Sequence, residues 1–276
     1  MTSPAVSDHR LLRPGELETD LRKLADALYA RPPATDNPLA ALVANRVDIE
    51  SARSFWARQW HVEQAYNQYA LPRLMEACPD VDARVQVFDV IGGEWGRGDP
   101  SRANPALFRQ FLLGLGVAAE AVPWEYDARR DEIARHIQRW EAGTWLELLV
   151  GELLGVKTVA PKVYGAIAGA LLAAPYGLSE AEVAFFRAHE EADVRDCDIV
   201  FELVARYAVT AELQAQARDA LRAFATGSRY ADYCCQLGAA PHAFEAQPGG
   251  IPLRLRDPVP PALRTPEKRS KSSIQP

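Results

Sequence analysis

The sequence predicts an all-α fold, and three observations support this prediction. Apolar residues recur at a helical period, close to 3.6 residues, along most of the chain, whereas strand-like alternation is scarce. Alanine, leucine, arginine and glutamate dominate the composition. Short stretches of turn-forming residues separate the periodic segments. We therefore expect a helical bundle, in which functional sites form from inward side chains on facing helices.

The expected helices are delimited by turn stretches, which are RPPATDNP at 31–38, ACPDVD at 77–82, GRGDPSRANP at 96–105 and PYGLS at 175–179. Ser179 and Glu182 form a capping-box pattern at the start of the helix after the last break. Pro72 should kink or end the helix in which it lies. Helices are expected at 15–30, 38–49, 51–77, 81–95, 104–115, 124–141, 143–173, 179–208 and 210–236.

A change in composition near residue 245 suggests a domain boundary. Residues 246–276 contain several prolines and the charged run RTPEKRSKSS, so we expect an extended or disordered tail there. Residues 1–245 are expected to form a single domain. The chain has 276 residues, 48% of them hydrophobic, which is enough for a large core.

The overall composition narrows the partners and the compartment. Lys plus Arg total 31 against 37 Asp plus Glu, a net charge of -6, so nucleic acid is not expected as a partner. The sequence shows neither an apolar run long enough to span a membrane nor the apolar region of a secretory signal near residue 1. The cysteines lack CxxC spacing and are expected to be reduced thiols. A cytoplasmic protein acting on a small molecule is expected, with a homodimer left open.

The clearest chemical signal is the helical segment FFRAHEEADVRDCDIVFELVARYA. His189, Asp193 and Asp196 are spaced i, i+4, i+7, which places them on one face of a helix. An imidazole and two carboxylates that converge in this way suit iron or manganese. Spacing alone equally allows a solvated polar face, because other charged residues lie nearby. These neighbours are Glu190, Glu191, Arg195 and Asp198.

Two glutamates favour the metal-binding interpretation. Glu63 shares a helical face with Trp56 and Trp60, and Glu94 shares a face with apolar residues between 87 and 91. A carboxylate on such a face is expected to be buried, and a buried charge needs a partner or a metal. An arginine partner is the structural alternative for each glutamate. Two such glutamates and the histidine helix are typical of the di-metal carboxylate pattern of helical bundles.

The sequence resembles the superfamily of haem-oxygenase-like diiron oxidases and oxygenases, over about residues 50–208. The superfamily shares its fold with haem oxygenase, thiaminase II and pyrroloquinoline-quinone synthase. The resemblance rests on Glu63 in an aromatic-rich helix and on GGEWGRGDPSRANPALFRQFLLGLG at 92–116. It rests also on the helix from His189, which follows GLSEAEVAFF. It implies a haem-oxygenase-like bundle with two Fe(II) ions, one of them labile, and O2 as co-substrate. The implied metal ligands are Glu63, Glu94, His189, Asp193 and Asp196, the first four also being catalytic.

The sequence departs from this family at several positions. Asp196 stands where the family usually has a histidine, and Asn104 stands where a histidine is common. Many members have a glutamate shortly before the proline that corresponds to Pro161, whereas Lys157 stands there in this chain. Glu152 is a substitute for that glutamate if the register differs. These departures leave open whether the site holds two irons or one.

The resemblance implies an O2-dependent oxidase or oxygenase. The expected substrate is a small aliphatic amino acid, which is desaturated, cyclised or hydroxylated by hydrogen abstraction, as in antibiotic biosynthesis. The alternatives are a metal-free relative, either thiaminase-II-like or cofactorless, and a noncatalytic binding protein on the same fold. An arginine suits a bidentate grip on a substrate carboxylate. The residues expected to bind substrate are Lys157, Arg97, Arg102, Asn104 and Glu152.

Overall fold

The structure is a computed structural model that describes residues 10–32, 37–44, 46–125 and 133–238. Within these ranges the regular structure is helical and contains no strand, which confirms the predicted all-α fold. None of the helices described is long and apolar enough to cross a membrane. The α-helices are α1 (Pro14–Tyr29), α2 (Pro38–Val43), α3 (Ile49–Ala65), α4 (Leu71–Glu76), α5 (Val81–Ile91), α6 (Asn104–Leu115), α7 (Ala134–Ala142), α8 (Trp145–Leu148), α9 (Gly155–Leu172), α10 (Ala184–Tyr207), α11 (Ala211–Gly227) and α12 (Arg229–Gly238).

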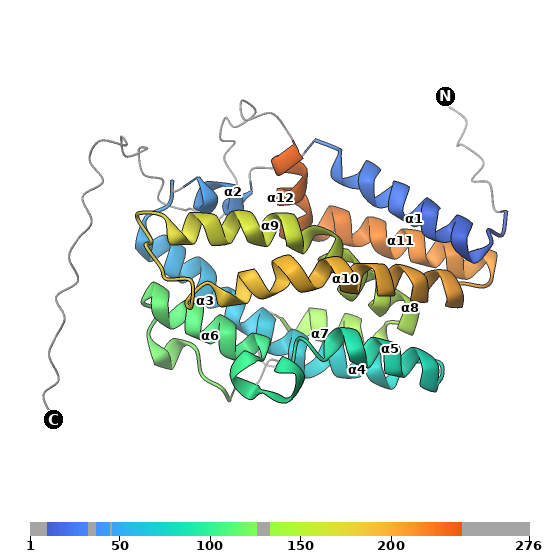
Figure 1. Ribbon diagram of the computed structural model, residues 1–276, viewed down its shortest axis with the longest axis horizontal. Helices are drawn as coiled ribbons and strands as arrows, with labels where there is room; N and C mark the ends of the chain where they lie inside the picture. The colour runs from blue at the N-terminus through green and yellow to red at the C-terminus, as the bar shows by residue number, and fades with distance from the viewer. Residues whose placement is uncertain (1–9, 33–36, 45, 126–132, 239–276) are drawn as a thin grey trace, which may run out of the picture.

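The helices form an elongated bundle in which α9 and α10 run side by side (Figure 1). At one end α1 packs against α11, and toward the other end α3 packs against α6 (Figure 1). The helix α10 contacts α6 as well as α1 and α5. The helix α10 therefore packs against helices at both ends of the bundle, and its central residues lie between these two ends.

Several elements differ from the sequence-based expectation. The helix expected at 81–95 ends at Ile91, where two consecutive glycines lower the helix propensity. The helix expected at 210–236 is divided, with Ser228 extended between α11 and α12. Ser179 and Glu182 form their capping pair at 2.8 Å, but α10 begins only at Ala184. Of the helix expected at 124–141, residues 126–132 lie outside the described residues, as does the expected tail at 246–276.

Two π-helical turns interrupt helices that are otherwise continuous. The turn η1 (Tyr66–Ala70) joins α3 to α4, and η6 (Leu149–Leu154) joins α8 to α9. Pro72 lies in the first turn of α4, which begins directly after η1, so a π turn precedes this proline. An extra residue in a helix rotates everything after it by about 100°. Each π turn therefore changes which side chains face the interior.

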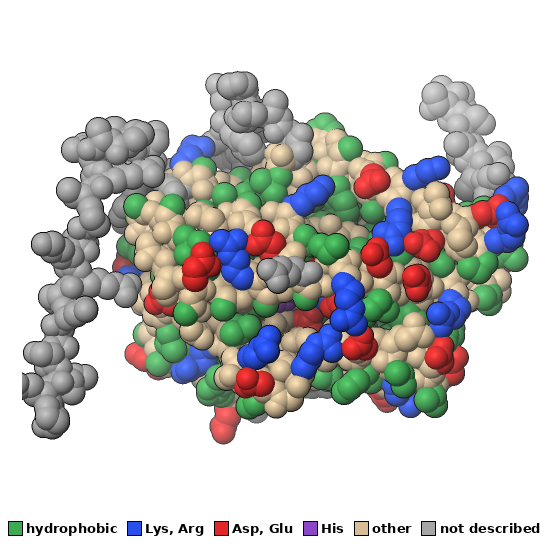
Figure 2. All heavy atoms as spheres, in the orientation of Figure 1, with side chains coloured by type: hydrophobic (Ala, Val, Ile, Leu, Met, Phe, Trp, Pro, Cys, Tyr) green, Lys and Arg blue, Asp and Glu red, His purple; other side chains and the backbone are tan. Residues whose placement is uncertain are grey.

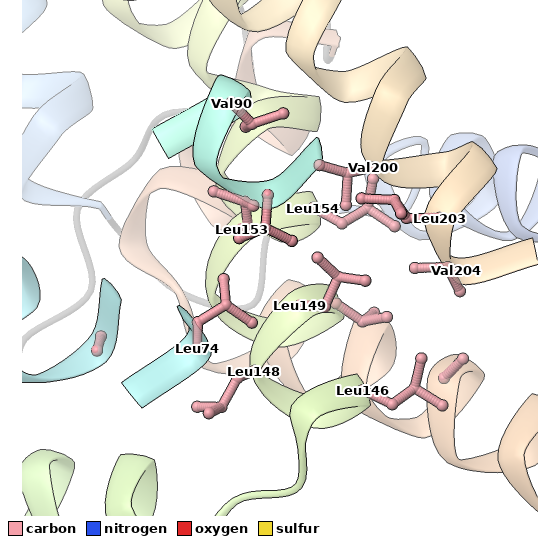
Figure 3. Packing of buried hydrophobic residues seen from close by; sticks show 14 of the residues in the cluster. Leu74, Val90, Leu146, Leu148, Leu149, Leu153, Leu154, Val200, Leu203 and Val204 are labelled. Carbon is pink, nitrogen blue, oxygen red and sulfur yellow. The ribbon is translucent and has the colours of Figure 1, made fainter. Parts of the chain in front are cut away.

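The hydrophobic core consists of two clusters. The first, here called the Leu154 cluster, joins α1, α4, α5, η6, α11 and the C-terminal half of α10. In Figure 3 the side chains of Leu149, Leu153 and Leu154 point toward those of Val200 and Leu203 on α10. The π turn η6 thus supplies the centre of this cluster.

The second cluster, here called the Trp56 cluster, joins α2, α3, α6, the C-terminal part of α9 and the start of α10. Its centre is aromatic. The ring of Trp56 makes edge contacts with Phe111 and Phe186, at centroid distances of 5.3 Å and 5.5 Å. Such pairs add to the stabilisation from area burial alone. The helix α10 therefore belongs to both clusters, with its start in the Trp56 cluster and its C-terminal half in the Leu154 cluster.

Candidate metal site

A layer of polar side chains, all of them buried except the partly buried Glu63, lies between the two clusters. Along α10, Phe186 belongs to the Trp56 cluster and Val200 to the Leu154 cluster, and the polar residues come between them. Where η6 continues into α9 the order is reversed, because Leu154 of the Leu154 cluster comes first, then Lys157, and then Val159 of the Trp56 cluster. We call these residues the polar layer, and they are Glu63 on α3, Glu94 after α5, Asn104 at the start of α6, Lys157 on α9, and His189, Asp193 and Asp196 on α10.

The side chain of Lys157 is the centre of the polar layer. Its Nζ lies 2.6 Å from Oδ1 of Asp193, 3.2 Å from Oε1 of Glu94 and 3.3 Å from Oδ2 of Asp196. Lys157 is only 3% exposed. Burial alone would lower the pKa of the Lys157 ammonium, but the three carboxylates raise it above its ordinary value. The ammonium therefore stays charged, donating hydrogen bonds to Asp193 and Glu94 and forming an ion pair with Asp196.

The loop between α5 and α6 brings Glu94 and Asn104 together. The backbone N–H of Asn104 donates to the carbonyl of Glu94 at 2.8 Å, and the Asn104 side-chain amide contacts Oε2 of Glu94. The loop needs glycine at Gly96, where φ is +72° and an added Cβ would lie 2.7 Å from the backbone nitrogen of Ala103. Burial alone would raise the pKa of Glu94, but Lys157 and His189 lower it to about 2.

The imidazole of His189 is held on both sides. Its Nδ1 lies 2.7 Å from the carbonyl oxygen of Phe185, and its Nε2 lies 2.9 Å from the amide nitrogen of Asn104. Nε2 also lies 3.7 Å from Oε2 of Glu94. Burial alone would lower the pKa of His189, but Glu94 and Asp193 raise it to about 9. A metal bound at Nε2 would therefore have to displace a proton.

Glu63 is the carboxylate of the layer that Lys157 does not contact. Its Oε1 accepts a hydrogen bond from the amide of Asn67 at 2.8 Å, and Asn67 lies in the π turn η1. Among the described residues Glu63 forms no ion pair. Burial and the neighbouring charge of Glu94 raise the pKa of Glu63 to about 7. Asn67 was not among the expected site residues, although its i+4 spacing from Glu63 is a signal that could have identified it.

The outward face of α10 carries charged residues that include Glu190, Arg195 and Asp198. Arg22 on α1 pairs with Asp198 at 2.8 Å, and Arg187 pairs with Glu190 at 2.8 Å. Figure 2 shows such acidic and basic side chains interleaved over the face that carries α10. The helix therefore has a solvated charged face and, separately, the buried face of His189, Asp193 and Asp196.

Three residues expected to bind substrate lie away from the layer. Arg97 bonds Asp89 at 3.0 Å and is half exposed, and Arg102 is exposed on the same loop. Glu152 pairs with Arg139 at 2.9 Å. The structure thus brings Lys157, and not Glu152, to the centre. The π turn η6 includes Glu152 and ends before Lys157, so it affects the relative orientation of the two residues.

A sequence profile described as iron-containing redox enzyme matches residues 53–230, so the chain belongs to this family of oxidoreductases. The match confirms the resemblance to the haem-oxygenase-like superfamily. It spans every residue of the polar layer. No curated protein matched the sequence.

The donor types of the polar layer suit iron. Glu63, Glu94 and His189 combine two carboxylates with an imidazole, a set that suits iron. In the described part of the chain, no three His, Cys, Asp or Glu side chains are already arranged so that they could hold a metal ion. The Asn104 amide bridges Glu94 and His189, and Lys157 already occupies the carboxylate oxygens on the opposite side.

Proposed function

We propose that the protein is an O2-dependent oxidase or oxygenase that holds iron with Glu63, Glu94 and His189. The observation that carries this proposal is the grouping of these side chains in one polar layer, in which Glu94 and His189 are buried and Glu63 is partly buried. Family membership supports a redox role for that layer. When bound there, iron would supply the electron-transfer chemistry toward O2.

The chain's own residues would orient the donors and control protons. Donation from Nδ1 of His189 to the Phe185 carbonyl fixes the ring and leaves Nε2 directed at Glu94 and Asn104. The hydrogen bond from Asn67 occupies Oε1 of Glu63, so Oε2 is the atom that would take or release a proton near pH 7. The hydrophobic clusters on both sides would exclude water from the layer.

The proposed substrate is a small aliphatic amino acid, which is desaturated, cyclised or hydroxylated, as in antibiotic biosynthesis. The rings of Tyr164 and Phe185 flank His189 at centroid distances of 5.1 Å and 4.6 Å. An apolar side chain would pack well against these rings. Arg97, Arg102 and Lys157 are engaged elsewhere or exposed, so recognition of the substrate carboxylate would depend on other groups.

Anaerobic titration of the full chain with Fe(II), followed by O2 and a panel of aliphatic amino acids, tests the proposal. We expect stoichiometric iron binding and amino-acid-dependent O2 consumption. The pairing of Lys157 with three carboxylates also supports the metal-free alternative, because it already supplies a cation. Absence of iron binding by the folded protein would favour that alternative or a noncatalytic binding protein. Iron binding with O2 consumption by other small molecules would retain the oxidase and reject the amino acid.

A further inference from the structure

We propose that the Lys157 ammonium takes the place of a second metal ion, so that the site binds one iron per chain. The inference rests on the proposed function, because it concerns the number of irons in the same site. It starts from the contacts of one nitrogen atom. Nζ of Lys157 lies within 3.3 Å of carboxylate oxygens from Glu94, Asp193 and Asp196.

These contacts have the arrangement of a bound cation. The three oxygens come from two separate elements, the α5–α6 loop and α10, and a metal on this side would need the same atoms. Oδ1 of Asp193 and Oε1 of Glu94 are each bonded to the ammonium. Oδ2 of Asp193 is buried and has no hydrogen-bond partner, so among the described residues this carboxylate is hydrogen-bonded through Oδ1 to Lys157. A second metal ion bound to these oxygens would have to displace the ammonium from them.

Burial keeps the ammonium in place. A lysine at the surface could turn outward and leave the carboxylates to a metal, but Lys157 is 3% exposed and Asp193 is 1% exposed. Hydrophobic residues of α9 and η6 surround it on both sides, including Leu154 and Val159. Withdrawing the ammonium would leave it unpaired among these apolar side chains.

Charge counting points the same way. Glu63, Glu94, Asp193 and Asp196 would carry four negative charges when all are ionised, which two divalent ions would neutralise. With Lys157 present, one divalent ion leaves a single negative charge, whereas a second would make the cluster positive. The donors that remain free of Lys157 include Glu63, Oε2 of Glu94, Nε2 of His189 and Oδ2 of Asp193, enough for a single ion.

The test is the metal content of the full-length protein after anaerobic loading with Mn(II) or Fe(II) and removal of free metal. We expect one ion per chain in the wild type and close to two in Lys157→Gln, where the carboxylates are freed. Lys157→Arg keeps the charge and should stay at one. Lys162→Gln removes an exposed lysine from the same helix and should also stay at one.

Two ions per wild-type chain, or a single ion in a folded Lys157→Gln variant, would overturn the inference. Absence of metal from the wild type would reject the proposed iron site, and with it the count of one. If Lys157→Gln does not fold, the electron paramagnetic resonance of Mn(II)-loaded wild type decides. An isolated Mn(II) signal supports the inference, and the signal of a coupled pair refutes it.

Discussion

The ammonium of Lys157 lies 2.6 Å from Oδ1 of Asp193, the shortest of its three ion pairs, and both side chains are almost completely buried. Each residue balances a charge that could not otherwise remain in the interior. Removing one partner of such a pair costs about 3–5 kcal/mol, because the other charge is left uncompensated. Stability and metal content therefore depend on the same contact.

From this pair we predict that Lys157→Met and Asp193→Asn each lower the free energy of unfolding of the metal-free protein by about 3 kcal/mol or more. The double variant should lose less than the sum, because it leaves neither group facing an absent partner. Urea denaturation in the presence of a chelator measures all three variants. Asp198→Asn is the control, because its carboxylate is largely exposed. Strict additivity would show that the two side chains are not coupled.

His189→Ala should abolish turnover and weaken iron binding by more than about 100-fold. Loss of a residue that only hydrogen-bonds to a metal ligand typically costs about 10–100-fold, and loss of the ligand itself should cost more. His189 is the only histidine in the polar layer. Iron affinity measured anaerobically, together with circular dichroism for helix content, checks this expectation. His136→Ala changes an exposed histidine on α7 and should leave iron binding unchanged. Full activity in purified His189→Ala would place the site elsewhere.

The pKa of Glu63, raised to about 7 from an ordinary value of 4.5, predicts a pH dependence of the metal-free protein. Between these values the folded state holds a proton that the unfolded state has lost. The contribution of Glu63 to stability is therefore fully present below pH 4.5 and is lost as the pH rises through 7. Its upper bound is about 3 kcal/mol.

Denaturation of wild type and Glu63→Gln from pH 5 to 8, with a chelator present, isolates this contribution, because other titrating groups are common to both. The variant should gain stability relative to wild type as the pH rises. Parallel curves would mean that Glu63 ionises at its ordinary pKa, and hence that it is not near Glu94 in a buried layer.

Two glycines of α9 predict opposite effects on stability. At Gly169 an added Cβ meets nothing within 4 Å, so Gly169→Ala should raise the free energy of unfolding by about 0.5–1 kcal/mol. At Gly155 the Cβ would lie 2.4 Å from the ring of Phe224, so Gly155→Ala should lower it by about 1–3 kcal/mol. Thermal denaturation of both variants gives the comparison. Equal shifts in one direction would contradict the packing of α9 against α11.

Helix type and position were predictable where the signals are local. The bounds of α6, Asn104–Leu115, agree with the expected helix, because Pro105 suits the first turn and Gly116 ends it in a left-handed conformation. The spacing of His189, Asp193 and Asp196 likewise predicted one buried face. Helical periodicity is enough for both results, since each concerns a single uninterrupted helix.

The orientation of Lys157 and Glu152 could not be obtained from the sequence. The π turn η6 includes Glu152 and ends just before α9, and its extra residue rotates α9 relative to the preceding helix. Such a turn is stabilised by tertiary packing, here of Leu149, Leu153 and Leu154, and leaves no mark on the apolar period. Glu94 was expected at the end of a helix but lies in a turn, where the backbone bond to Asn104 directs it inward.

The polar layer lies between the Leu154 cluster and the Trp56 cluster, and this position affects what a substitution in the layer can do to the protein. Each segment that contributes a charged group is anchored above and below by side chains that never touch the cation. A substitution at position 157 can then replace the ammonium by a metal ion while the two hydrophobic clusters keep their packing. Because the ion pair of Lys157 with Asp193 also stabilises the fold, such an exchange would change metal content and stability together.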